Sequence, residues 1–263
     1  MFKFIHLFSN SITASLLLSI AIAIIGSVML INRYNYLAAS IAHGSYGGVG
    51  MALYFGISIL FGATIFALIL ALIFAYLTYK SHRHVDVYIS ILWAVGMSIG
   101  IIFNDLTPGY HPDLLAYLFG DILLVPQSDL YYMFFVDVIL IIYILMFYHH
   151  ILAIAYDKEF AKTRGLPVGF LHTLTLILIA FTVVMSIRSI GLILVIALLS
   201  IPPFIAQKFT KNFASMIIVS GILGLIVQIV GLFIANTFDI SATASIILVA
   251  ALFFGLSIIK DRK

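Results

Sequence analysis

The chain has 263 residues, of which 64% are hydrophobic and 9% are charged, and its formal net charge is +3. A water-soluble domain has about 25% charged and about 45–50% apolar residues, so this composition excludes a soluble globular enzyme and a disordered chain. The absence of cysteine excludes disulfides and thiolate metal sites. We therefore expect an all-α, polytopic helical membrane protein that forms a single transmembrane domain over residues 1–263.

The predicted spans follow from long apolar runs, because a backbone in lipid satisfies its hydrogen bonds within helices. Residues 34–79 contain no Asp, Glu, Lys or Arg, and this length exceeds one crossing of about 30 Å, so the segment holds two spans. Its glycines indicate close helix packing or a broken helix. Arg188 interrupts another apolar run, and we expect it at an interfacial hairpin tip, because an Arg at mid-membrane costs about 2.5–3.5 kcal/mol.

In chain order, the remaining spans are expected at about residues 12–31, 87–103, 130–150, 165–187, 189–205, 213–235 and 240–259. The sequence thus predicts about nine transmembrane helices, within a range of eight to ten.

The distribution of basic residues predicts the orientation. With the N-terminus outside, only Lys3 and Arg188 of the 13 Lys and Arg residues fall on the outer face. The C-terminus is then cytoplasmic. The outer face instead receives acidic side chains that attract cations or a basic partner, namely Asp105, Asp113, Asp121, Asp129 and Asp239.

A cytoplasmic segment at about residues 151–167 contains the only glutamate of the chain, Glu159. Acidic residues open it, basic residues follow, and glycine and proline end it, which is typical of a short helix matched to its own dipole. Two interpretations stay open for this helix. It docks a motor subunit, or it lies at the interface without a partner.

Three ionisable residues are candidates for a membrane pathway, because such groups are costly in lipid and usually functional. His43 offers a neutral imidazole, which binds Zn, Mn or Fe, although a structural hydrogen bond to a neighbouring helix is the alternative. Asp137 begins the fifth span, and Asp239 directly precedes the ninth. Each faces an aqueous path or lies in interfacial water, and for Asp137 we favour interfacial water.

The motifs exclude several catalytic classes. The chain has no Gly-Lys-Ser/Thr phosphate loop and no H-E-x-x-H helix, and one glutamate leaves little scope for paired-carboxylate catalysis. We therefore expect a transport protein, not an enzyme, with no cofactor bound by this chain. The alternative is a gradient-driven secondary metal or ion transporter or channel that uses His43 and Asp137. Reconstitution of the chain alone distinguishes the two.

Four segments occur along the chain in the order NRYNYLAASIAHGSYGGVGMAL, AYLFGDILLVPQSDL, AYDKEFAKTRGLPV and IRSIGLILVIALLSIPPFIA. Together they resemble the permease subunits of bacterial and archaeal ABC importers for metal cations, the group that handles zinc, manganese or iron. The resemblance runs over nearly the whole length.

The resemblance implies an inner-membrane, multi-pass permease whose transported substrate is a divalent metal. It also implies three kinds of partner: a cytoplasmic ATPase that uses ATP, an extracytoplasmic metal-binding protein, and a second permease copy in a homodimer or heterodimer. His43 matches the family's pathway histidine, and Asp239 is a second candidate. The ATPase-coupling residues would be Tyr156, Asp157, Glu159, Phe160, Ala161 and Gly165.

The sequence departs from the family pattern at two places. The family commonly has Asp four residues before the pathway histidine, where this chain has Ala39. The family's Asp-Leu-Pro-Ser-Gly segment loses its proline and glycine in residues 239–243. A hard ion such as Mn²⁺ would miss the carboxylate most. The sequence therefore predicts the class of cargo but not which metal, nor whether the metal is chelated.

Overall fold

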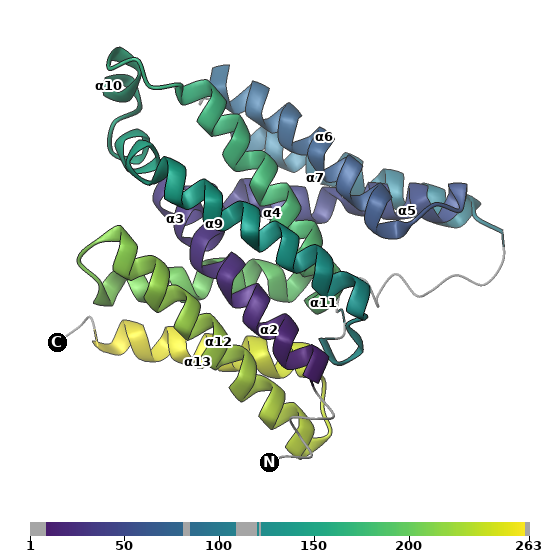
Figure 1. Ribbon diagram of the computed structural model, residues 1–263. Coiled ribbons are helices and arrows are strands. Elements are labelled where there is room, and N and C mark those ends of the chain that lie inside the picture. Colours follow the sequence, from purple (N-terminus) through teal and green to yellow (C-terminus); the bar gives the residue numbers. More distant parts are fainter. Residues whose placement is uncertain (1–8, 81–84, 109–119, 121, 261–263) are drawn as a thin grey trace. The chain divides into compact units, whose positions relative to one another are not determined.

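The computed structural model describes residues 9–80, 85–108, 120 and 122–260 (Figure 1). Within these ranges all regular structure is helical, as the composition predicts. Asp113 and Asp121 of the expected acidic outer face lie outside the described residues, as do Lys3 and most of the segment that precedes Gly120.

Two compact units interleave along the chain. The first comprises Met1–Asn32, Leu114–Ile144 and Met185–Lys263, and the second comprises Arg33–Asp113 and Leu145–Val184. Two long helices, α9 (Gln127–Tyr156) and α11 (Val168–Phe209), contribute residues to both units.

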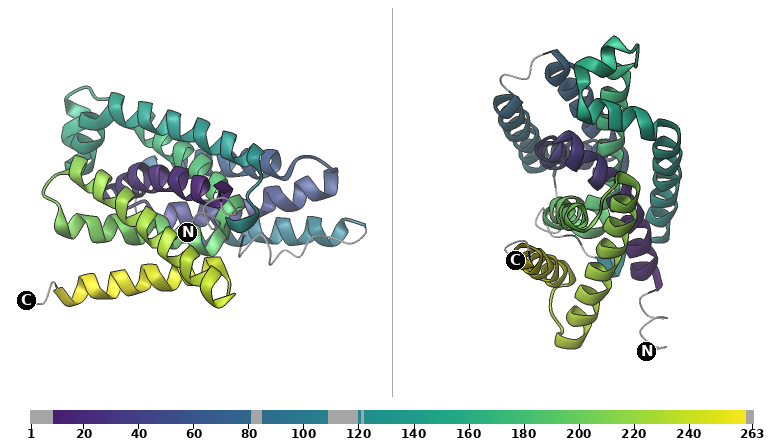
Figure 2. Two further views of the ribbon diagram at one scale, coloured as in Figure 1. Left: turned by 60° about the horizontal axis from the view of Figure 1, so that its bottom comes forward. Right: turned by 90° about the vertical axis from the view of Figure 1, so that its left-hand side faces the viewer.

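In the first unit, α2 (Ser9–Ala21) continues through a π-helical turn, η1 (Ile22–Gly26), into α3 (Ser27–Asn32). This helical run packs against α12 (Phe213–Phe238), which is followed by α13 (Ala242–Lys260) at its side (Figures 1 and 2). A short 3₁₀ turn, η2 (Ile122–Leu124), precedes α9. The Gln228 amide donates to the Ser15 carbonyl at 3.4 Å and so joins α12 to α2.

In the second unit, α4 (Asn35–Gly44) and α5 (Tyr46–Phe55) form one broken helical run, followed by α6 (Ile59–Lys80) and α7 (Val85–Leu106). Glycines allow the backbones of these helices to touch. A Cβ atom added to Gly96 would lie 2.6 Å from the Gly44 Cα, and one added to Gly50 would lie 2.7 Å from the Gly100 Cα. Both the close packing and the break expected from the glycine-rich segment are present.

The helix α11 is broken, but the break does not lie at Arg188 as expected. Its 42 residues would measure about 63 Å if straight, about twice the hydrocarbon core. The break falls at Gly191, whose φ of 75° and ψ of 163° are readily adopted only by glycine. Arg188 itself is helical and is not a turn residue. Its charge is compensated by Asp129, so the physical reason for an interfacial tip at Arg188 does not apply.

Seven helices in the described part of the chain are long and apolar enough to cross a membrane. Two segments account for the difference between these seven helices and the nine expected spans. The helices α4 and α5 have 10 residues each, so neither is long enough when taken alone. The broken helix α11 is counted once, although the sequence predicts two spans there.

Candidate functional site

The segment between α9 and α11 forms a short helix, α10 (Lys158–Thr163), as its charge order predicts (Figure 1). The first six residues of the expected segment 151–167 form the end of α9, which extends to Tyr156. Asp157 caps the helix: its Oδ1 accepts a hydrogen bond from the Phe160 N–H at 2.9 Å. Gly165 ends the segment with a φ of 77°, a left-handed conformation that favours glycine.

The side chains around α10 divide into a buried anchor and an exposed face. Ala161 is 1% exposed and so lies on the buried side of the helix within the second unit. Tyr156 and Phe160 are 89% and 53% exposed, and Glu159 is exposed in the first turn. Exposed aromatic rings are typical of a protein-binding surface. All six expected coupling residues therefore lie on or directly beside one short helix.

Lys158 connects this helix to the end of α6. Its Nζ lies 5.0 Å from the centre of the Tyr79 ring, within the range of a cation–π contact. Burial lowers the pKa of Lys158, while Glu159 raises it and Lys162 lowers it. The Tyr79 ring is also close to α11, because a Cβ added to Gly169 would lie 3.3 Å from the ring. One aromatic ring thus touches α10 and α11.

Next to this ring, His172 of α11 is buried and hydrogen-bonded at both ring nitrogens. Its Nε2 lies 2.8 Å from the Thr78 hydroxyl, and its Nδ1 lies 2.7 Å from the Tyr34 hydroxyl. The Thr78 hydroxyl donates its one hydrogen to the Phe74 carbonyl, so His172 Nε2 donates to Thr78 and Nδ1 accepts from Tyr34. A neutral imidazole satisfies all of these hydrogen bonds. Together they join α6, α11 and the start of α4.

His43 lies in the last turn of α4 and is half-buried. Its Nδ1 donates to the Ala39 carbonyl at 2.8 Å, and its ring packs on Trp93 of α7 with ring centres 4.2 Å apart. Because Nδ1 carries the proton, Nε2 keeps its lone pair, which is the form in which imidazole binds a metal. The structural contact and the ligand function are therefore compatible in this side chain.

The two aspartates proposed beside His43 differ in their surroundings. Asp239 is exposed and ends α12 with a φ of 53°, a conformation that Asp adopts more readily than most residues. Asp137 is only 2% exposed, in the first third of α9, so the interpretation as an interfacial carboxylate in water is wrong. No group of three or more His, Asp or Glu side chains in the described residues is placed to hold a metal ion.

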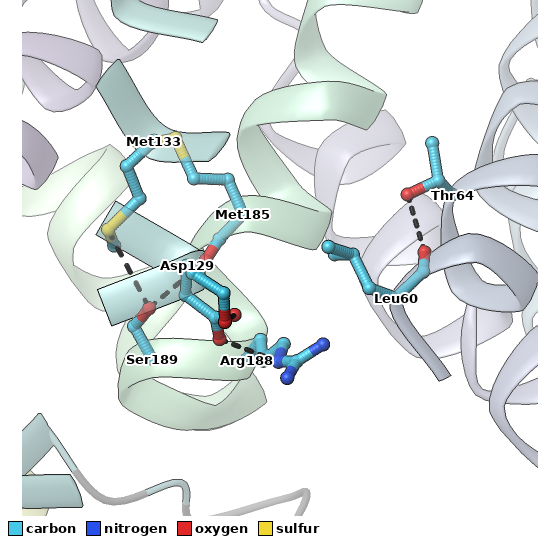
Figure 3. Close-up of polar contacts among 8 residues, drawn as sticks. Leu60, Thr64, Asp129, Met133, Met185, Arg188 and Ser189 are labelled. Carbon is cyan, nitrogen blue, oxygen red and sulfur yellow. Dashed lines mark hydrogen bonds and ion pairs between the residues drawn. The ribbon is translucent and has the colours of Figure 1, made fainter. Parts of the chain in front are cut away.

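An ion pair between a partly exposed arginine and a buried aspartate lies two turns before Asp137. Arg188 Nε is 2.6 Å from Asp129 Oδ2, and the neighbouring Ser189 hydroxyl donates to the Met185 carbonyl at 3.4 Å and faces the Met133 sulfur at 3.9 Å (Figure 3). The start of α9 is therefore held against α11 by charge and by packing within the first unit.

Comparison with known proteins decides the family. The ABC 3 transport family matches residues 4–261, almost the entire chain. The chain belongs to the ABC 3 transport family.

Relatives of this ABC 3 chain match over most of their length. It is 42% identical over 253 residues to an uncharacterized membrane protein of Synechocystis sp., covering 96% of this chain and 90% of the relative. It is 29% identical to the manganese transport system membrane protein MntC of Halalkalibacterium halodurans, covering 97% and 87%. Among solved structures, PsaBC from Streptococcus pneumoniae in complex with Fab matches with a TM-score of 0.84 and 29% identity, covering 96% and 91%.

Two residues of the candidate site in this ABC 3 chain, His172 and Tyr79, were not predicted from the sequence. His172 lies within a predicted span, and the criterion that selected His43, an ionisable side chain in an apolar run, would have found it. Tyr79 gave no such signal, because aromatic residues near the ends of membrane helices are common.

Proposed function

We propose that this chain is the permease subunit of an ABC importer for a divalent metal cation, and that a separate ATPase subunit powers its alternating access. Membership of the ABC 3 family and the similarity to a manganese transport membrane protein support this function. The structural similarity to PsaBC supports the same architecture. An extracytoplasmic binding protein and a second permease copy would complete the transporter.

The observation that carries the proposal is the exposed face of α10. Tyr156, Phe160 and Glu159 project from a helix that is fixed at Ala161 and capped by Asp157. An apolar and acidic surface on a rigid helix suits docking of a partner, because its aromatic side chains lose little conformational entropy on binding. The ATPase is the partner that this surface would bind.

Contacts within the second unit offer a route from α10 to the pathway histidine. Lys158 contacts Tyr79 at the end of α6, and the adjacent Thr78 bonds His172, which bonds Tyr34. Tyr34 directly precedes α4, the helix that carries His43. We infer that displacement of α10 by the ATPase moves α4 through this chain of contacts.

The same contacts support the proposed topology. The start of α4, the end of α6, α10 and the start of α11 meet in one unit, and the sequence predicts the cytoplasmic face for all four. A broken crossing through α4 and α5, and two crossings in α11, added to the other six apolar helices, make nine spans. The N-terminus would lie outside and the C-terminus in the cytoplasm.

The proposed cargo contact is His43, with Asp239 as a second candidate. A His43 Nε2 lone pair suits Zn²⁺, Mn²⁺ or Fe²⁺ as a transient ligand. The Nδ1 atom is held by the backbone carbonyl of Ala39, whose side chain has no oxygen, so the family's carboxylate is missing beside His43. Weak binding by one imidazole agrees with a pathway that must release its cargo.

The partner claim is tested by purification. Tagged permease is extracted from native membranes in mild detergent, and the co-purifying proteins are identified by mass spectrometry. We expect a protein with a Gly-x-x-x-x-Gly-Lys-Ser/Thr phosphate loop at near-equimolar amount. Recovery of the permease without any nucleotide-binding protein, in several detergents and after cross-linking in membranes, would contradict the proposal.

A further inference from the structure

Asp137 is a buried carboxylate that has no part in the contacts described above. Its side chain lies in the eleventh position of α9, and neither carboxylate oxygen has a hydrogen-bond partner among the described residues. It is 2% exposed. About 15 Å of helix separates it from the start of α9, which places it well inside a hydrocarbon core of about 30 Å.

The neighbours of Asp137 on the same helix face do not neutralise it. The buried residues that precede and follow it on this face within two turns are apolar: Met133, Val136, Leu140 and Ile144. The ion pair earlier on α9 does not involve Asp137, because Arg188 contacts Asp129. An ionised carboxylate without a partner in such surroundings is strongly unfavourable, so the group is neutralised by a proton or by a cation.

Neutral donor atoms lie one turn away. Met133 precedes Asp137 by four residues and so shares its helix face, and the Met133 sulfur lies 3.9 Å from the Ser189 hydroxyl of α11 (Figure 3). The Asp137 carboxylate is a ligand type that suits Mn²⁺, and a thioether such as that of Met133 is a soft ligand that suits Zn²⁺. With a single carboxylate, such a site binds weakly and releases its ion, as a transport path requires.

We propose that Asp137 is a cation-binding carboxylate of the transport path, which holds the divalent cargo transiently inside the first unit. This inference rests on the proposed function, because it assigns a second contact to the same cargo. It places a carboxylate ligand on α9, a helix other than the one that carries His43.

The first test detects binding without transport. Dicyclohexylcarbodiimide, which modifies carboxyl groups in apolar surroundings, is applied to the purified permease–ATPase complex in lipid nanodiscs, and modified peptides are quantified by mass spectrometry. We expect modification at Asp137, and a decrease of at least about tenfold when Mn²⁺ or Zn²⁺ is present, in line with the sensitivity of metal sites to loss of one group. Mg²⁺ serves as the control ion.

Asp129 is the matched control residue on the same helix. It is similarly buried but paired with Arg188, so its modification should be low and independent of metal. Equal modification of Asp137 with and without saturating Mn²⁺ and Zn²⁺ would overturn the proposal.

The second test uses Asp137→Asn, which keeps the shape and removes the charge. ATP-driven uptake of Mn²⁺ and Zn²⁺ should fall by at least about tenfold while co-purification with the ATPase is unchanged. Wild-type uptake by Asp137→Asn would overturn this inference and leave the proposed function intact. Absence of ATP-driven uptake in the wild-type complex would contradict the proposed function instead, and the carbodiimide assay would still report on cation binding.

Discussion

The Nζ atom of Lys158 lies 5.0 Å from the centre of the Tyr79 ring, so the first residue of α10 contacts the last turn of α6. A cation over an aromatic face contributes about 0.5–1 kcal/mol at exposed sites and about 2 kcal/mol when desolvated. Lys158 is half-buried, and its lowered pKa reflects that loss of water. Besides the direct chain connections to α9 and α11, Tyr79 is therefore a residue through which movement of α10 would reach the membrane helices.

Replacement of Tyr79 by leucine should uncouple the transporter. Leucine fills part of the same space but offers no π face to Lys158, so the amount of metal transported per ATP hydrolysed should fall several-fold. Tyr79→Phe keeps the ring and should behave like the wild type. The measurement is the ratio of metal uptake to phosphate release in proteoliposomes. Equal ratios for the leucine and phenylalanine variants would show that the ring contact has no coupling role.

The helices were predictable from the sequence because long apolar runs in lipid have few alternatives to helix. The observed bounds of α7, α12 and α13 lie within three residues of the expected spans. The breaks were less predictable. The break in α11 depends on the backbone of Gly191, whereas hydropathy pointed to Arg188, whose charge Asp129 compensates.

At the candidate site, local patterns were readable and long-range partners were not. The short helix α10 follows from the charge order of its segment, whereas its cap by Asp157 is seen only in the structure. The burial of Asp137 does not, because a single carboxylate near the start of an apolar run resembles an interfacial residue. The bonds of His172 to Tyr34 and Thr78 join positions 138 and 94 residues apart, which no local pattern reports.

Glu159→Lys should weaken docking of the ATPase. The substitution reverses the charge on the exposed face of α10 without touching the Asp157 cap or the Ala161 anchor. Loss of one partner of an interfacial charge pair costs about 2–5 kcal/mol when the pair is buried in the complex. Stimulation of ATP hydrolysis by the permease should be lost, and Glu159→Gln should give an intermediate effect. Undiminished stimulation by Glu159→Lys would argue against this surface as the docking site.

Two substitutions separate the ligand function of His43 from its packing. His43→Ala removes both the imidazole and its contact with Trp93, whereas His43→Phe keeps an aromatic ring on Trp93 without a metal-binding nitrogen. If Nε2 binds the cargo, metal uptake should be lost in both variants while the complex still assembles. Uptake that survives in His43→Phe would identify the histidine as a structural contact.

Gly50→Ala should destabilise the second unit. The added Cβ would lie 2.7 Å from the Gly100 Cα, and both partners are backbone, so α5 and α7 must move apart at a cost of about 1–3 kcal/mol. The matched control is Gly255→Ala, since that Cβ would meet nothing within 4 Å and alanine favours helix. Thermal unfolding in detergent can be followed by the fluorescence of Trp93, the single tryptophan, which lies on α7. A Gly50→Ala midpoint equal to that of Gly255→Ala would refute the close backbone contact.

The most direct measurement is metal accumulation by proteoliposomes that contain this permease, with or without its co-purifying ATPase, in the presence of the metal-binding protein. An importer powered by a separate subunit should accumulate Mn²⁺ or Zn²⁺ only when the ATPase and ATP are both present, and should stay inactive under a proton or ion gradient alone. Accumulation by the permease alone, driven by a gradient and indifferent to ATP, would instead identify a secondary transporter and contradict the account.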